Sequence, residues 1–126
     1  MEVKSIDLSW IVVKDLKQAI QFYTEVVGLK LMELNEEYGW AELQGHQGGS
    51  RLGIAKSHEM NKIEAGQNAC VTFSVENLEK AKAKLLSHAT RSIGEIQEVP
   101  GHVKLQMMQD RDGNYFQLVE TLTSFP

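Results

Sequence analysis

The sequence predicts an α+β fold built from two copies of a βαβββ module. Three observations support this prediction. A short segment recurs about half a chain later, each copy joins a strand-like run to a capped amphipathic helix, and each helix precedes three short strand-like runs. We expect one domain over residues 3–122, with module one at about 3–57 and module two at about 68–122. A linker at about 58–67 joins them, and residues 123–126 form a tail.

The recurring segment is VVKDLKQA, residues 12–19, which returns as SVENLEKA, residues 74–81. Four pairs match, each 62 positions apart: Val13 with Val75, Asp15 with Asn77, Leu16 with Leu78 and Ala19 with Ala81. Two copies of one module explain this offset. The alternative is that strand, cap and helix junctions look alike in any protein.

Each module begins with a strand and a capped helix. The runs SIDLSWIVV (5–13) and ACVTFSV (69–75) are rich in β-branched and aromatic residues. Asp15 and Asn77 follow them, and their side-chain oxygens suit helix N-caps. One helical face then carries Leu16, Ala19, Ile20 and Tyr23 in module one, and Leu78, Ala81 and Leu85 in module two. Gly28 and Gly94 are expected where these helices, or the turns after them, end.

Three strand candidates complete each module. In module one they are LKLMEL (29–34), YGWAELQ (38–44) and SRLGIAK (50–56), with GHQGG (45–49) as a hairpin loop. In module two they are SIGEIQEV (92–99), HVKLQMMQ (102–109) and NYFQLVET (114–121). Pro100-Gly101 and Asp112-Gly113 are typical of the turns between them.

Composition excludes several classes of protein. The net charge of −4 argues against a nucleic-acid partner, which would require clustered Lys and Arg. No apolar run approaches the ~20 residues of a membrane span. The start MEVKSIDLSW lacks the apolar core and cleavage site of a signal peptide. Cys70 is the single cysteine, which fits a reducing compartment, so we expect a cytoplasmic protein.

Two motifs resemble those of the vicinal oxygen chelate superfamily, which contains glyoxalase I, extradiol dioxygenases and bleomycin-resistance proteins. They are VVKDLKQAIQFYTEVVGLKL near the start and DRDGNYFQLVE, residues 110–120, near the end. The resemblance covers about residues 3–122. It implies that the two modules form curled mixed sheets around a cavity, with helices outside, and that the protein is a homodimer. It does not fix the activity.

The resemblance also implies where a metal ion would bind. Metal-dependent members are expected to use one ligand on the first strand of each module and one on a later strand. The matching positions here hold Leu8, Gly53, Cys70 and Gln117. A divalent metal requires several converging N, O or S donors, and Leu8 and Gly53 provide none. We therefore expect no metal, with a divalent ion as the alternative, and we expect Cys70 to be a small buried hydrophobic residue.

The histidines do not supply the missing ligands. His46 and His58 fall in predicted loops, His88 near a helix end and His102 beside the Pro-Gly turn. None occupies a matched position. A new site built from His58 and His102 is conceivable, but their spacing does not support it.

Strand alternation predicts which side chains face the cavity, because residues two apart share a face. This places Trp10, Trp40 and Tyr115 on the inner faces as flat surfaces. Glu42, Arg51, Thr72 and Gln117 accompany them as polar groups. Aromatic residues on strands are often only core, yet their convergence on one face favours ligand binding.

These observations lead to one hypothesis and two alternatives. The first is a metal-free protein that binds a flat or aromatic organic ligand, neutral or cationic. The second is a lyase, isomerase or dioxygenase with a displaced metal site or with metal-free chemistry. For chemistry without a metal, Glu42 is a weak candidate for a general base and Cys70 for a nucleophile. The third is an interaction module, in which Trp10 and Trp40 would touch across a closed interior.

Overall fold

The computed structural model describes residues 2, 4, 7–57, 63–66 and 70–122. The chain divides into two compact units, Met1–Ala69 (unit 1) and Cys70–Pro126 (unit 2), and each is described by itself. Their boundary falls at the end of the predicted linker. Residues 58–62 and 67 of that linker, and the predicted tail at 123–126, lie outside the described residues.

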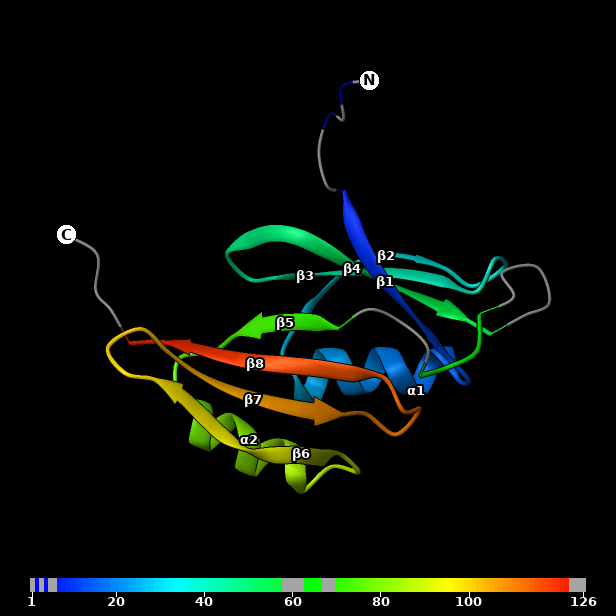
Figure 1. Cartoon of the computed structure of the whole chain (residues 1–126). Coiled ribbons are helices and arrows are strands. Elements are labelled where there is room, and N and C mark those ends of the chain that lie inside the picture. The colour runs from blue at the N-terminus through cyan, green and yellow to red at the C-terminus, as the bar shows by residue number, and fades with distance from the viewer. Residues whose placement is uncertain (1, 3, 5–6, 58–62, 67–69, 123–126) are drawn as a thin grey trace. The chain divides into compact units, whose positions relative to one another are not determined.

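The described residues of unit 1 form an α-helix, a π-helical turn and a four-stranded sheet. Its elements are β1 (Leu8–Val13), α1 (Leu16–Gln21), the π-helical turn η1 (Phe22–Val26), β2 (Lys30–Asn35), β3 (Trp40–Gly45) and β4 (Gly48–Lys56). The strand order is β1-β4-β3-β2 (Figure 1). β1 runs parallel to β4, whereas β3 is antiparallel to both of its neighbours.

Unit 2 repeats this plan. Its elements are β5 (Val71–Ser74), α2 (Leu78–Leu86), β6 (Arg91–Val99), β7 (Val103–Gln109) and β8 (Tyr115–Thr121). The order is β5-β8-β7-β6, with β5 parallel to β8 and the other pairs antiparallel. The predicted fold class, two βαβββ modules with mixed sheets, is therefore confirmed.

Both predicted helix caps are present. The Asp15 carboxylate accepts a hydrogen bond from Gln18 N at 3.0 Å, and the Asn77 amide oxygen accepts one from Lys80 N at 2.9 Å. Unit 2 adds a second acceptor, because Glu120 Oε1 of β8 accepts from Leu78 N at 2.7 Å. Two of the free N–H groups of α2 are thus satisfied, one of them by a strand that is distant in sequence.

Each sheet buries one face. In unit 1 one face carries the buried residues Ile11, Val13, Ala41, Leu43, Leu52 and Ile54. On the other face Trp10, Trp40, Glu42 and Arg51 are partly exposed, whereas Val12, Gly53 and Ala55 are buried as well. In unit 2 Phe116 and Leu118 of β8 are buried, whereas Tyr115 between the turn and Phe116 is exposed. α1 contacts β3 and β4, and α2 contacts β6, β7 and β8. The period-two pattern therefore separates a core face from a second face in each sheet.

Three local predictions were wrong. Gly94 does not follow the helix: it lies inside β6 with φ +72°, where the pairing with β7 shifts between Ile93 and Gln97. The predicted loop GHQGG is mostly strand, since β3 ends at Gly45 and β4 starts at Gly48. Cys70 is exposed and precedes β5 instead of being buried within it.

The turn between β7 and β8 depends on a residue that the sequence motif does not single out. Asp110 Oδ1 accepts hydrogen bonds from Asp112 N at 3.0 Å and Asn114 N at 2.8 Å, and Oδ2 accepts from Asn114 Nδ2 at 3.1 Å. Asp110 and Asn114 are both buried. Gly113, with φ +90°, completes the turn by donating from its N–H to Asp110 O. Asp110 therefore organises the DRDGN segment.

Candidate functional site

The second face of the unit 1 sheet collects four of the predicted ligand-binding residues. Trp10 of β1 lies opposite Gly53 of β4, and Gly53 lies opposite Glu42 of β3. Trp40 is two residues before Glu42 on β3, so both share this face. Arg51 is two residues before Gly53 on β4. The register therefore places Trp10, Trp40, Glu42 and Arg51 on one surface, as predicted.

The two tryptophans form an aromatic pair. Their ring centroids are 6.2 Å apart, and the ring planes are inclined at 59°. Both residues are half-buried. They lie side by side on one sheet face, and both keep exposed area. Such a pair presents aromatic surface against which a planar molecule can stack.

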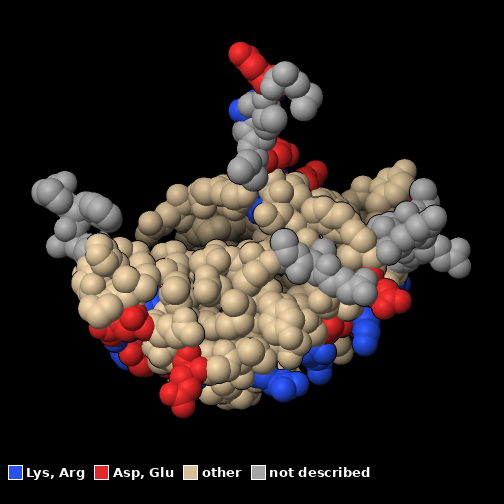
Figure 2. Space-filling model, in the orientation of Figure 1, with Lys and Arg blue, Asp and Glu red and all other residues tan. Residues whose placement is uncertain are grey.

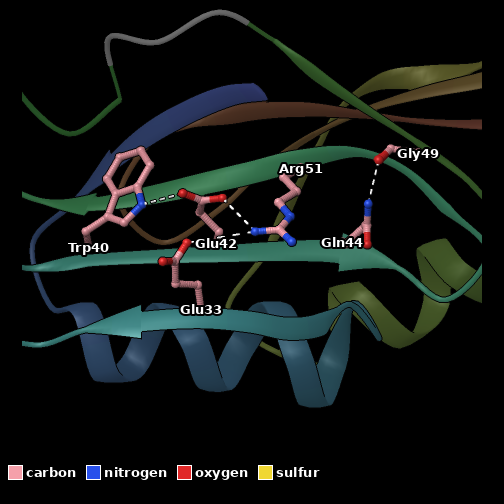
Figure 3. A network of polar contacts seen from close by, with 6 residues as sticks. All are labelled: Glu33, Trp40, Glu42, Gln44, Gly49 and Arg51. Atoms are coloured by element: carbon pink, nitrogen blue, oxygen red, sulfur yellow. Dashed lines mark hydrogen bonds and ion pairs between the residues drawn. The ribbon is translucent and has the colours of Figure 1, made fainter. Parts of the chain in front are cut away.

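A polar network connects Trp40 to charged side chains on β2, β3 and β4 (Figure 3). The Trp40 indole N–H donates to Glu42 Oε2 at 2.9 Å, and Arg51 donates from a terminal guanidinium nitrogen to Glu42 Oε1 at 3.0 Å. A second carboxylate, that of Glu33 on β2, lies 3.8 Å from the same nitrogen. Both oxygens of Glu42 are thus engaged, and its side chain is only 16% exposed.

These contacts determine the protonation state of Glu42. The hydrogen bond from Trp40, and then that from Arg51, hold the pKa of the Glu42 carboxyl below its ordinary value of 4.5. A general base that works near neutral pH requires a higher pKa than this. Glu42 is therefore poorly suited to proton transfer and well suited to hold a fixed negative charge beside the indole rings.

The lowered pKa makes the stability of the fold depend on pH. A group whose pKa is lower in the folded state stabilises the fold above its unfolded pKa, and this contribution disappears as the pH falls through the folded value. We expect Glu42→Gln to reduce the free energy of unfolding at pH 7, with the difference from wild type shrinking below pH 4.5. Urea unfolding from pH 7 to pH 3 measures this. A difference that is independent of pH would contradict the assignment.

Unit 2 places the other predicted residues on the second face of its own sheet. Thr72 of β5 lies opposite Gln117 of β8, and its hydroxyl donates to Gln117 Oε1 at 3.2 Å. Tyr115 is 43% exposed at the start of β8. Gln117 is also paired with Met107 of β7. The oxygen that would have bound a cation in Gln117 therefore accepts a hydrogen bond from Thr72.

Cys70 lies beside this group as an inert thiol. Its Sγ is 3.6 Å from Met107 Sδ. The residue is exposed, yet the protein atoms around the sulfur remove enough water to raise the pKa of the thiol. A raised pKa keeps the sulfur protonated at neutral pH. Cys70 is thus a poor nucleophile, although the residue as a whole is exposed and not buried as the sequence predicted.

The four positions implied for a metal ion do not fit one. Leu8 has no donor atom, and Gly53 has no side chain. A side chain there would have no space, because a Cβ built on Gly53 would meet Trp40 Cη2 and come within 2.7 Å of Cζ2. Among the described residues, no group of three or more His, Cys, Asp or Glu side chains could hold an ion. What remains is a protonated thiol and an occupied amide, a weak donor set for a divalent metal.

Three contributors to these surfaces were not predicted. Glu33 joins the network because β2 pairs with β3 and places Glu33 opposite Glu42, across a register shift that alternation cannot foresee. Met107 of β7 lies near Cys70 because only β8 separates β7 from β5 in the sheet of unit 2. The sequence singled out Gly53 only because it has no metal-binding side chain. A glycine inside a strand of a sheet that also carries tryptophans could have indicated a close approach between a ring and the backbone.

On the face drawn in Figure 2, the described Lys and Arg side chains lie among Asp and Glu side chains and form no continuous basic patch. In the part of the chain that the structure describes, no helix has the length and apolar character needed to cross a membrane.

A model of one protein family matches most of the chain. The family model described as Glyoxalase/Bleomycin resistance protein/Dioxygenase superfamily matches residues 5–118. The comparison with curated proteins finds no match.

Solved structures share the fold at low sequence identity. A member of that superfamily from Sphaerobacter thermophilus DSM 20745 has 17% identity and a TM-score of 0.79, over 94% of this chain and 98% of its own. TnmS3, an antibiotic binding protein from Streptomyces sp. CB03234, has 20% identity and a TM-score of 0.77, over 96% and 98%. FosX, a fosfomycin resistance protein from Listeria monocytogenes, has 12% identity and a TM-score of 0.73, over 94% of each chain.

Proposed function

Because the chain belongs to the glyoxalase/bleomycin resistance protein/dioxygenase superfamily, we propose that it binds a flat organic ligand without a metal ion. The ligand stacks on the indole rings of Trp10 and Trp40 on the second face of the unit 1 sheet. The observation that carries this proposal is the Trp40 ring itself. It lies over Gly53, in the space where a ligating side chain would stand, and contacts Trp10.

The charges beside the rings favour a neutral or cationic ligand. The network contains two carboxylates, Glu42 and Glu33, and one guanidinium, Arg51, which pairs more closely with Glu42. The side chain of Glu33 is 59% exposed and is therefore available to an approaching cation. Indole faces attract cations as well, by about 0.5–2 kcal/mol.

The two candidate catalytic residues support binding more than catalysis. Glu42 has a lowered pKa and Cys70 a raised one, so neither suits acid–base or nucleophilic chemistry near neutral pH. TnmS3, which shares the fold, is described as an antibiotic binding protein. The proposal extends to a homodimer, which the family resemblance implies, and to a cytoplasmic location, which the single cysteine favours. On the sheet of unit 2, taken by itself, Thr72, Tyr115 and Gln117 are proposed as ligand-binding residues.

The proposal predicts that ligand binding is independent of divalent metals. Purified protein would be analysed for metal content and then mixed with Ni²⁺, Zn²⁺, Mn²⁺ or Fe²⁺ in a thermal-shift assay. We expect substoichiometric metal and no rise in the unfolding temperature. The planar cation proflavine should raise the unfolding temperature equally with and without EDTA, whereas the planar anion 9-anthracenecarboxylate should raise it less.

Two results would contradict the proposal. Stoichiometric metal that is lost on substitution of Gln117 or Cys70 would indicate a metal site and revive the enzyme hypothesis. Equal stabilisation by tetraethylammonium, a cation without a planar ring, would show that charge alone accounts for the effect and that the tryptophan pair does not stack on the ligand.

A further inference from the structure

Gly53 lies in the centre of the second face of the unit 1 sheet, between two larger neighbours. Its cross-strand partners are Trp10 on one side and Glu42 on the other. A Cβ built on Gly53 would meet the outer edge of the Trp40 ring, at Cη2 and Cζ2, and would come within 3.0 Å of Trp10 Cβ. Real Cβ atoms do not approach other atoms so closely. The indole therefore rests against the bare backbone of β4.

The position of the indole has an electrostatic consequence. The benzene edge of Trp40 contacts Gly53, and the pyrrole N–H donates to Glu42 Oε2 at 2.9 Å. The other oxygen of Glu42 accepts from Arg51. A side chain at position 53 would push the ring off β4 and move its N–H away from the carboxylate. Gly53 is thus connected to the charged groups through one rigid aromatic ring.

We propose that Gly53 is a positioning residue of the ligand site, whose missing side chain provides the space in which the Trp40 ring lies and holds the Glu42 carboxylate. This inference rests on the proposed function for its consequence in binding. Its structural part, from Gly53 to Trp40 to Glu42, stands on the contacts alone. Gly53 is consequently required for the shape of the aromatic surface and for the place of the negative charge beside it.

Space, and not backbone conformation, explains the glycine. Gly53 does not have a positive φ, so any L-amino acid could adopt its backbone conformation. Gly45, at the end of β3, is the matched case. It also lacks a positive φ, but a Cβ there would meet only Gly48 O, at an ordinary distance of 3.5 Å. Alanine is therefore expected to be tolerated at position 45 and to displace a ring at position 53.

The test compares Gly53→Ala with Gly45→Ala in the absence of ligand. The chain has two tryptophans, so the ¹H–¹⁵N spectrum contains two indole signals, and Trp40→Phe assigns them. We expect Gly53→Ala to shift the Trp40 indole signal and to raise the pKa of Glu42 toward 4.5, followed by carboxyl ¹³C titration. Gly45→Ala should change neither. An unchanged indole signal and pKa in Gly53→Ala would overturn the proposal.

A rescue variant covers the case in which Gly53→Ala does not fold. Phenylalanine lacks the outer edge that carries Cη2 and Cζ2, so Gly53→Ala combined with Trp40→Phe should relieve most of the clash. We expect this double variant to fold and to unfold at a higher urea concentration than Gly53→Ala. A double variant that is no more stable than Gly53→Ala would show that Trp40 is not what position 53 accommodates.

A binding arm separates this inference from the proposed function. We expect Gly53→Ala to weaken proflavine binding at least tenfold and Gly45→Ala to leave it unchanged. If wild type does not bind proflavine while the Trp40 and Glu42 signals respond as expected, the proposed function fails and the positioning role stands. If wild type binds and Gly53→Ala binds equally well, the positioning role fails and the proposed function stands.

Discussion

Replacing Trp40 with alanine is expected to abolish most ligand binding. The variant removes one of the two stacking rings and the N–H that donates to Glu42. We expect proflavine affinity to fall by at least tenfold, or about 1.4 kcal/mol. Because Trp40 is half-buried, the free energy of unfolding should fall by roughly 2 kcal/mol, less than the ~3–5 kcal/mol typical of a fully buried aromatic residue. Fluorescence titration and urea unfolding measure the two effects.

Trp40→Phe separates stacking from hydrogen bonding. Phenylalanine retains an aromatic face but has no N–H, so it should preserve part of the proflavine affinity while the pKa of Glu42 rises. An affinity for Trp40→Ala equal to that of wild type would remove the second unit 1 face from consideration. The ligand contacts would then have to be sought on the unit 2 residues Thr72, Tyr115 and Gln117.

Among the substitutions considered outside the tryptophan pair, Asp110→Ala is expected to lower the free energy of unfolding most. The substitution removes the three hydrogen bonds that Asp112 N, Asn114 N and Asn114 Nδ2 donate to the Asp110 carboxylate. Asn114 is buried, and a hydrogen bond to a charged group contributes about 1.5–3 kcal/mol to stability. We expect the free energy of unfolding to fall by roughly 2–4 kcal/mol, as measured by urea denaturation with circular dichroism.

The matched control for this variant is Glu76→Ala, which removes an exposed carboxylate from unit 2. It should change the free energy of unfolding by less than about 0.5 kcal/mol. Asp110→Asn retains one acceptor oxygen and should fall between the two. If Asp110→Ala and Glu76→Ala were equally stable, the turn would not depend on Asp110, and the DRDGN segment would owe its shape to Gly113 alone.

Most of the fold follows from local sequence patterns. The caps at Asp15 and Asn77 and the alternation at Phe116 and Leu118 are short-range effects, and the structure confirms them. Gly94 was misplaced because a β-bulge and a helix end both use a glycine with positive φ. Distinguishing them requires the register of β6 on β7, which is a pairing between segments and not a property of either one.

The site could be predicted only in part, for the same reason. Alternation along β1, β3 and β4 correctly brought Trp10, Trp40, Glu42 and Arg51 to one face. It could not show that Trp40 lies over Gly53, or that Glu33 lies opposite Glu42 across a register shift. Those facts depend on which residues face each other on neighbouring strands. The same cross-strand contacts show that Glu42, which the sequence suggested as a weak candidate base, accepts hydrogen bonds from Trp40 and Arg51.

The central claim is that a planar ligand binds on the Trp10 and Trp40 rings without a metal ion. The most direct measurement is a ¹H–¹⁵N titration of the protein with proflavine in EDTA, observing the two indole signals. We expect both signals to shift together and to saturate, and to do so equally when Zn²⁺ or Ni²⁺ replaces EDTA. Indole signals that remain unchanged, or that respond only in the presence of a metal, would contradict the claim.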